Sequence, residues 1–328
     1  MNTQFMLLLI LLDPDTYSLI GWVVLMMLSA FAGVMLYMKP RSKTRWSAAA
    51  LLLTMWAAFI YGFYVGNDEL RVVEVEYASA DLPAAFDGYR IVQFGDTHLE
   101  AFEGKRRDLL ERVVDSIKAQ HADMIVFVGD LQNRHPDEVK PFIDLLGSVK
   151  APDGVYSVLG NHDYPDYLGN DDPFEISGLT GRSVENHQLL GWHLLCNSHH
   201  LVHRGNDSIV IAGMDNDGDG RFPANGDISQ ALSHIRRNQF VVMLEHDPSS
   251  WRRKILPHCH AQLTLSGHTH GGQLNLFGWS PASLRYHEYG GMYYMGDRAL
   301  CVTQGVGAAI PFRLGVPSEI VVITLKKK

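Results

Sequence analysis

The chain has 328 residues, of which 46% are hydrophobic and 20% charged, and a formal net charge of -8. This length accommodates one large or two ordinary domains with a deep core. The charge is negative and Lys and Arg form no extended run, so the composition argues against nucleic acid as a partner. Cys196, Cys259 and Cys301 form no CxxC pair, which argues against a structural zinc site and leaves a single disulfide open.

The N-terminal part contains two apolar runs without a charged residue, at 17–38 and 47–66. Each is long enough to cross a bilayer, which takes about 20 residues. A pair of core helices is the alternative, whereas a cleaved signal peptide is disfavoured because no Lys or Arg precedes residue 39. The sequence therefore predicts a membrane anchor over residues 1–67 with two transmembrane helices.

The charges around these runs predict how the anchor is oriented. The loop between the runs is basic and the flanking segments are acidic, with Lys39, Arg41, Lys43 and Arg45 against Asp13, Asp15, Asp68 and Glu69. Short basic loops stay in the cytoplasm. We expect a multi-pass protein of the cell membrane with residues 68–328 on the extracytoplasmic face; re-entrant or peripheral packing of the hairpin is the alternative.

Beyond residue 67 the chain alternates short apolar runs with helical stretches. The periodicity predicts a helix over 105–119 with one buried stripe, and the Asp, Gly, Asn and Pro content of 165–187 predicts a surface loop. Strands mixed with helices predict an α/β layered fold for one domain, residues 68–328. The predicted strands are 71–77, 90–94, 124–128, 155–159, 208–212, 240–244, 262–266 and 319–325.

Five polar blocks come directly after predicted strands: Gly95–His98, Gly129–Asp130, Gly160–Asp163, Glu245–Asp247 and Gly267–His270. Strand ends converge at one edge of an α/β sheet, where such folds place their ligands. A glycine in front of the polar residue lets the backbone turn sharply there.

The side chains of these blocks form a set suited to metal ions. Oxygen and imidazole ligands without thiolate suit Mn, Fe or Zn rather than Ca. The candidate ligands are Asp96, His98, Asp130, Asn161, His246, His268 and His270. Seven ligands exceed one tetrahedral ion, and a bridging carboxylate would give each of two divalent ions four ligands plus open positions for water and substrate.

The ordered series DxH, GD, GNHD, H and GHTH resembles the calcineurin-like metallophosphoesterase superfamily over about residues 88–326. GHTHGGQ at 267–273 and TQGVG…PFRLG…SEIVVITL at 303–325 resemble its bacterial membrane and cell-envelope phosphodiesterase branch. Some members of that branch act as UDP-diacylglucosamine pyrophosphatases in lipid A synthesis. The resemblance implies a layered β-sandwich flanked by helices and hydrolysis of a phosphodiester or pyrophosphate bond by a two-metal-activated water.

The same resemblance implies roles for individual residues. The first ion would be held by Asp96, His98, Asp130 and His270, and the second by Asp130, Asn161, His246 and His268, with Asp130 as the bridge. His162 would be catalytic without being a ligand, contacting phosphate or protonating the leaving oxygen. Many relatives carry Asp where this chain has Asn133, which can accept the same hydrogen bond but stabilises an imidazolium less.

Two function classes follow. We expect a phosphoesterase acting on a lipid-linked or envelope substrate, although an extracytoplasmic domain argues against a cytosolic UDP-sugar. The alternative is a catalytically silent membrane-bound metal-binding or sensing module, which the presence of His162 disfavours. The His199, His200 and His203 cluster is interpreted as structural. The run Asp215–Gly220 imitates a calcium loop, but Gly226 stands where the bidentate Glu is needed.

Overall fold

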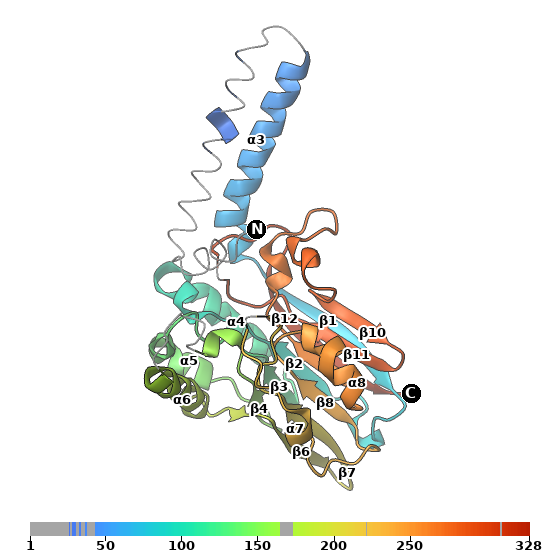
Figure 1. Ribbon diagram of the computed structural model, residues 1–328. Helices are drawn as coiled ribbons and strands as arrows, with labels where there is room; N and C mark the ends of the chain where they lie inside the picture. Colours follow the sequence, from blue (N-terminus) through green and yellow to red (C-terminus); the bar gives the residue numbers. More distant parts are fainter. Residues whose placement is uncertain are drawn as a thin grey trace.

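The computed structural model describes residues 26, 28–30, 33, 37, 43–164, 173–220, 222–308 and 310–328. From residue 70 onward the chain forms two six-stranded sheets (Figure 1). The first sheet has the order β1 (Leu70–Ser79), β12 (Ser318–Lys327), β2 (Arg90–Phe94), β3 (Met124–Phe127), β4 (Val155–Ser157) and β5 (His193–Leu194). The second has the order β10 (Gly291–Met295), β11 (Arg298–Val302), β9 (Leu263–Ser266), β8 (Val241–Leu244), β7 (Asp207–Gly213) and β6 (Ser198–Arg204).

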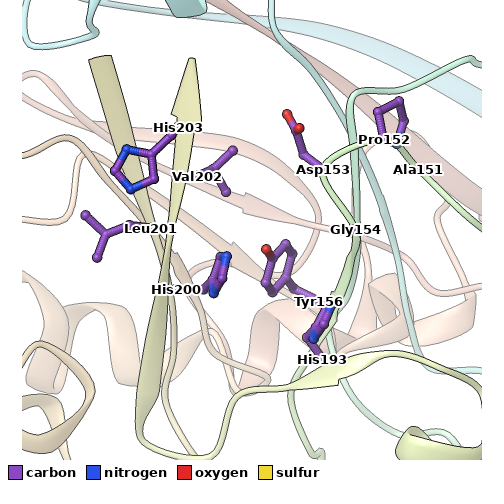
Figure 2. Close-up of a pocket in the computed structure, with 10 residues that line it drawn as sticks. All are labelled: Ala151, Pro152, Asp153, Gly154, Tyr156, His193, His200, Leu201, Val202 and His203. Atoms are coloured by element: carbon purple, nitrogen blue, oxygen red, sulfur yellow. The ribbon is translucent and has the colours of Figure 1, made fainter. Parts of the chain in front are cut away.

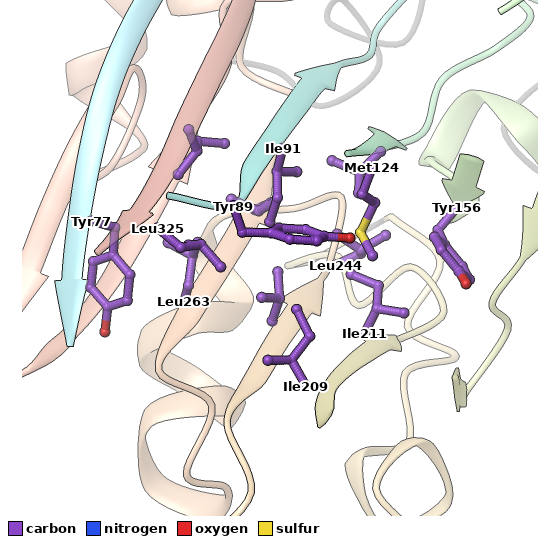
Figure 3. Close-up of a cluster of buried hydrophobic side chains, with 14 of the residues drawn as sticks. Tyr77, Tyr89, Ile91, Met124, Tyr156, Ile209, Ile211, Leu244, Leu263 and Leu325 are labelled. Atoms are coloured by element: carbon purple, nitrogen blue, oxygen red, sulfur yellow. The ribbon is translucent and has the colours of Figure 1, made fainter. Parts of the chain in front are cut away.

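The main core lies between the two sheets. Figure 3 shows Ile91 and Met124 of the first sheet facing Ile211 and Leu244 of the second, all fully buried. Side chains alternate along a strand, so Ile91 points into this core while the next residue, Val92, belongs to a second cluster on the outer face. Burial on both faces explains why these strands read as continuous apolar runs rather than alternating ones.

Helices cover the outer faces. The predicted helix over 105–119 is present as α4 (Arg107–Ala119), preceded by a 3-10 turn at Gly104–Arg106, and its predicted stripe packs with α5 (Ile143–Gly147) on the first sheet. The second sheet is covered by Trp251 and Ile255 and by α7 (Ile228–Ala231) and α8 (Leu256–His258). The mixed α/β fold with two sheets and outer helices is therefore confirmed.

The loop predicted for 165–187 is wrong over its second half. Residues 173–189 form helix α6 (Pro173–Leu189), while 165–172 lie outside the described residues. The inner face of this helix is polar: Asn186 donates to the carbonyl oxygen of Pro136 (2.8 Å), and a ring nitrogen of buried His187 lies 2.9 Å from Ser157 Oγ. A helix that is held by hydrogen bonds lacks the apolar stripe by which sequence patterns reveal helices.

The second predicted membrane helix, 47–66, corresponds to α3 (Lys43–Tyr64), which projects away from the sheets (Figure 1). By length and composition Ala49–Asp68 is the one segment among the described residues that could cross a membrane, and 11% of its most apolar window is buried. The first predicted helix, 17–38, lies for the most part outside the described residues. The hairpin therefore stays a prediction.

The core between the sheets predicts a large difference between two leucines. Replacing fully buried Leu263 by Ala is expected to lower the free energy of unfolding by about 2–5 kcal/mol, because it removes buried methyl groups and leaves a cavity. Leu189→Ala at the exposed end of α6 is the matched control and is expected to change it little. Denaturant unfolding of the detergent-solubilised protein measures both; equal losses would contradict the assigned core.

Candidate metal centre

The five polar blocks follow β2, β3, β4, β8 and β9, all at the carboxyl ends of these strands. β2, β3 and β4 run parallel in the first sheet, and β8 and β9 run parallel in the second. The site therefore does not lie at the edge of one sheet, as the sequence led us to expect. It lies where the carboxyl ends of two stacked sheets meet, which is why residues far apart in the chain come together.

One cluster consists of Asp96, His98 and His270, whose ligand-type atoms all lie within 4.8 Å of one another. The Nε2 atoms of His98 and His270 are 2.9 Å apart, and His270 Nε2 is 3.7 Å from Asp96 Oδ1. All three residues are buried. These atoms form one group able to hold a metal ion.

A second cluster consists of Asp130, His246 and His268. His246 Nε2 is 3.2 Å from Asp130 Oδ2 and 3.3 Å from His268 Nδ1. The amide oxygen of Asn161 joins this cluster, 3.2 Å from His246 Nε2 and 2.7 Å from His268 Nδ1. All seven residues predicted as ligands thus lie in two adjoining groups.

Asp130 lies between the two clusters. Its Oδ2 atom is 3.6 Å from His98 Nε2 on one side and 3.2 Å from His246 Nε2 on the other. Its Oδ1 atom accepts the main-chain N–H of His162 (2.8 Å). The Asp130 carboxylate is therefore within reach of both groups of metal-type side chains.

The backbone of the site is strained. Asp96, His98, Asp130, His268 and His270 all have positive φ angles, between 44° and 74°. For residues other than glycine this conformation costs about 1–3 kcal/mol each and persists only where the surrounding structure holds it. Such strain concentrated in the candidate ligands indicates a functional site.

The glycines of the motifs act by permitting close approach as well as by turning the chain. A Cβ on Gly160 would overlap the Asp130 carboxylate, and a Cβ on Gly267 would overlap that of Asp96. Neither glycine has a positive φ, unlike Gly129 (φ 95°). Gly160 and Gly267 are therefore required for packing against the ligands.

Electrostatics keep several ligands in the form that binds metal. Burial lowers the pKa of His98 to about 3 and that of His268 to about 4, so both imidazoles are neutral at neutral pH, as coordination requires. Burial opposes ionisation of Asp130, yet His246 and His162 beside it hold the pKa of this carboxyl well below its usual range. The bridging candidate is an anion.

Asp96 supplies an independent test of whether cations fit. Its Oδ2 atom is buried and has no hydrogen-bond partner among the described residues. A carboxylate oxygen in this position costs free energy unless a cation neutralises it. The donor set and this unpartnered oxygen both fit divalent metal ions.

Asp163 is a supporting residue that sequence reasoning left without a role. Its carboxylate accepts main-chain N–H groups from Gly160 (2.8 Å), Asp130 (3.0 Å) and Leu131 (3.1 Å). It therefore ties the loop after β3 to the loop after β4. The sequence signal was its place in GNHD, directly after two site residues.

Arg313, within PFRLG, is a second supporting residue without an assigned role. Its guanidinium is fully buried and donates to the carbonyl oxygens of Gln304, Gly305, Val316 and Pro317, at 3.1–3.2 Å. The loop that it organises packs on the first cluster, since the Gly307 N–H donates to the carbonyl oxygen of Asp96 (2.8 Å). Arg313 positions the backbone of a ligand.

His162 forms a third metal-type group with His98 and Asp130, and its ring lies 4.6 Å from that of His98 in an edge-to-face arrangement. Its Nδ1 atom is 2.6 Å from the main-chain oxygen of Asn133, whereas the Asn133 side chain donates to Glu100. The expectation that the Asn133 side chain would accept this hydrogen bond is therefore wrong. Because a main-chain carbonyl is the acceptor, an Asn here still leaves the imidazole oriented.

The acidic run after β7 is held by protein cations. The carboxylate of Asp217 is buried between Lys254 and Arg253, the latter at 3.1 Å. Nearby, the Phe222 ring packs edge-on against the His268 ring, with centroids 4.9 Å apart. Phe222, two residues after the run, therefore borders the second cluster, and the charge of Asp217 is paired with protein cations.

A cavity of about 330 Å³ is separate from the metal residues. It is lined by the segment before β4, by Tyr156 of β4, by His193 of β5 and by β6 with His200 and His203 (Figure 2). Gly154 lies at the amino end of β4, opposite the end that carries Asn161. His199 lies 2.8 Å from the carbonyl oxygen of Ala231, and this histidine cluster forms no metal-type group among the described residues.

All three cysteines are unpaired.

The family model described as calcineurin-like phosphoesterase matches residues 89–272. A transmembrane protein with metallophosphoesterase domain from Danio rerio is 31% identical over 86% of this chain, which spans 63% of that protein. A metallophosphoesterase of Bacillus subtilis is 30% identical over 85% of this chain and 93% of its own length.

Among solved structures, the protein TT1561 of Thermus thermophilus is 14% identical with a TM-score of 0.40, covering 67% of this chain and 90% of that one. The family match, whose residues include both clusters, and the Bacillus relative carry the assignment. The chain belongs to the calcineurin-like phosphoesterase family.

Proposed function

We propose that this chain hydrolyses a phosphodiester or pyrophosphate bond at a site that holds two divalent metal ions. A metal-dependent phosphoesterase follows from the family and from the clustered Asp and His groups. The number of ions and the kind of bond are the proposal. The observation that carries it is the Asp130 carboxylate, which lies between two groups of metal-type ligands.

The residues divide between two positions. Asp96, His98 and His270 would hold one ion and Asn161, His246 and His268 the other, with Asp130 shared. When bound, ions of the Mn, Fe or Zn type supply a hydroxide nucleophile at neutral pH and neutralise charge on the phosphoryl oxygens. The protein contributes a buried set of ligands, in which neutral His98 and His268 and anionic Asp130 already have the form that coordination requires.

His162 is the proposed catalytic residue outside the ligand set. With the proton of Nδ1 donated to the Asn133 carbonyl, the ring is held in one tautomer and one orientation. From this position the imidazole would contact phosphate or protonate the leaving oxygen, a contribution of about 10²–10⁴ to the rate.

We also propose that residues 1–67 anchor residues 68–328 to a membrane through two helices, with the catalytic domain on the extracytoplasmic face. Three observations support the anchor. The described residues of α3 are mostly exposed and apolar, Trp56 of α3 donates to Ser29 of the other predicted helix (2.7 Å), and the Danio rerio relative is named a transmembrane protein. An anchored domain fits a lipid-linked or envelope substrate.

Replacing His162 by Ala is expected to lower the rate of bis-p-nitrophenyl phosphate hydrolysis about 10²–10⁴-fold while bound Mn stays unchanged, because a proton donor and no ligand is lost. Activity is measured with Mn present and metal content by elemental analysis. His200→Ala, in the separate cavity, is the matched control and is expected to keep both. Wild-type protein that binds metal without hydrolysing any phosphoester would instead favour the silent metal-binding module.

Replacing Asp130 by Asn is expected to empty both metal positions, because each cluster loses the anionic oxygen that it shares. Metal content and activity should fall together. Asp153→Asn, at the amino end of β4, controls for loss of a carboxylate elsewhere. Retention of both ions in the Asp130 variant would contradict the bridging role.

Replacing Asp163 by Asn is expected to weaken metal binding about 10–100-fold, the usual effect of removing a residue that orients ligands. Asp163 touches no proposed ion, so the effect would arise from the loops of Asp130 and Gly160. Asp123→Asn is the control, since Asp123 also accepts a main-chain N–H, from Arg90 (2.7 Å), away from the site. Titration with Mn measures both; equal affinities would remove the assigned role.

A further inference from the structure

A short segment of the second half of the chain exposes large apolar side chains. Phe277 is fully exposed, Leu284 is 79% exposed, and Leu276 and Trp279 are about half exposed. These residues lie within nine positions of one another, between the metal-type residue His270 and strand β10. Apolar groups gathered in this way mark a contact with another apolar body.

The segment begins with a tight turn. The main chains of Leu276 and Trp279 exchange two hydrogen bonds (2.9 and 3.0 Å), and the residues between them, Phe277 and Gly278, have φ angles of 55° and 87°. Two positive φ values are what a type I′ hairpin turn requires, and Asn or Gly is favoured at its first position. A phenylalanine there costs free energy and places an exposed aromatic ring at the tip of the turn.

Hydrogen bonds and ring packing connect this turn to the C-terminal end of α3, which is called its foot below. The Asn275 N–H donates to Leu314 (2.8 Å), and the Gln273 side chain donates to the carbonyl oxygens of Ile310 and Phe312 (2.7 Å each). Phe312 in turn packs against Phe63 of α3, with ring centroids 5.4 Å apart. In Figure 1 the orange segments of this region lie at the foot of α3.

The packing at the foot of α3 is close. A Cβ on Gly62 would overlap the Phe312 ring, and the Arg313 N–H donates to the carbonyl oxygen of Gly62 (3.0 Å). Tyr61 and Tyr64 are exposed at the same end of the helix. Tyr and Trp are enriched where a membrane meets water, which is the level that the foot of a spanning helix occupies.

We infer that the turn Leu276–Trp279 is a second membrane contact, which docks against the surface of the bilayer that α3 crosses. The inference rests on the proposed anchoring by α3. The bilayer is the occupant because hydrogen bonds to Leu314 and Phe312, and the packing of Phe312 on Phe63, hold the turn next to the C-terminal end of α3. Exposed Tyr61 and Tyr64 at that end are residues typical of a membrane surface.

The contact has a consequence for the metal centre. The segment that carries the turn also carries His268 and His270 at one end and Tyr286 at the other, and the Tyr286 hydroxyl lies 2.7 Å from His268 Nε2. Docking of the turn would therefore hold the segment that carries these ligands next to the bilayer surface. Phosphoesters of the headgroup layer are the substrates that this placement favours.

The experiment uses the full chain reconstituted into phosphatidylcholine vesicles. Phe277→Cys is labelled with an environment-sensitive fluorophore, Leu189→Cys on α6 is the matched exposed control, and labelling of the native cysteines is subtracted with the unsubstituted protein. We expect a blue shift at position 277 and quenching by lipid that carries a doxyl group near the headgroup. The label at position 189 should be quenched by aqueous iodide instead.

A second pair of labelled variants tests whether the label at position 277 itself causes the contact with lipid. Trp279→Cys is labelled with and without Phe277→Asp, and the Asp should abolish the blue shift because a carboxylate is costly in the bilayer. Iodide quenching at 277 equal to that at 189, in protein that floats with the vesicles, would overturn the inference. Protein that does not float would overturn it too.

The same measurements distinguish failure of the proposed hydrolysis from failure of the proposed docking. Quenching needs no catalysis, so a protein inactive on bis-p-nitrophenyl phosphate but protected at position 277 would lose the proposed hydrolysis and keep the docking surface. An active protein with a water-exposed turn would give the reverse result.

Discussion

The Asp130 carboxylate is an anion buried at the junction of two sheets. Much of the surrounding fold supplies the groups that stabilise this buried charge. Burial disfavours its charge, and the free energy is recovered from imidazoles on both sides and from the main-chain N–H of His162. The partners come from strands of both sheets, so they exist only once the sheets have stacked. The core shown in Figure 3 is thus a condition for the metal centre as well as for stability.

The same constraint explains the loops. The other ligands reach Asp130 from four strand ends, and the ligands after β2 and β9, like Asp130 itself, have positive φ angles, which are costly for Asp and His. Asp163 and Arg313 offset that cost by satisfying main-chain groups of these loops. The loop of Arg313 also contacts α3, so one stretch of chain joins the metal centre to the proposed anchor.

Much of the site was predictable because its parts are local. A glycine, an apolar strand and a polar residue directly after it can be recognised within each motif, and Asp96, His98, Asp130, Asn161, His246, His268 and His270 all lie together in the structure. Helix α6 and strands β5, β6, β10 and β11 were not predicted. The inner face of α6 is polar and β6 is rich in histidine, so neither shows the apolar pattern that identifies an element from sequence.

The sequence by itself determined the chemistry of this protein: which side chains follow which strands, that they are oxygen and imidazole donors, and that an apolar segment precedes them. Tertiary structure alone decided that the strand ends come from two sheets, that a main-chain carbonyl orients His162, and that the turn at Phe277 lies at the foot of α3. The physical reason is the separation along the chain of the residues that interact. Strand and motif patterns arise from neighbours in the chain, whereas these contacts join residues whose distance in sequence leaves no local trace.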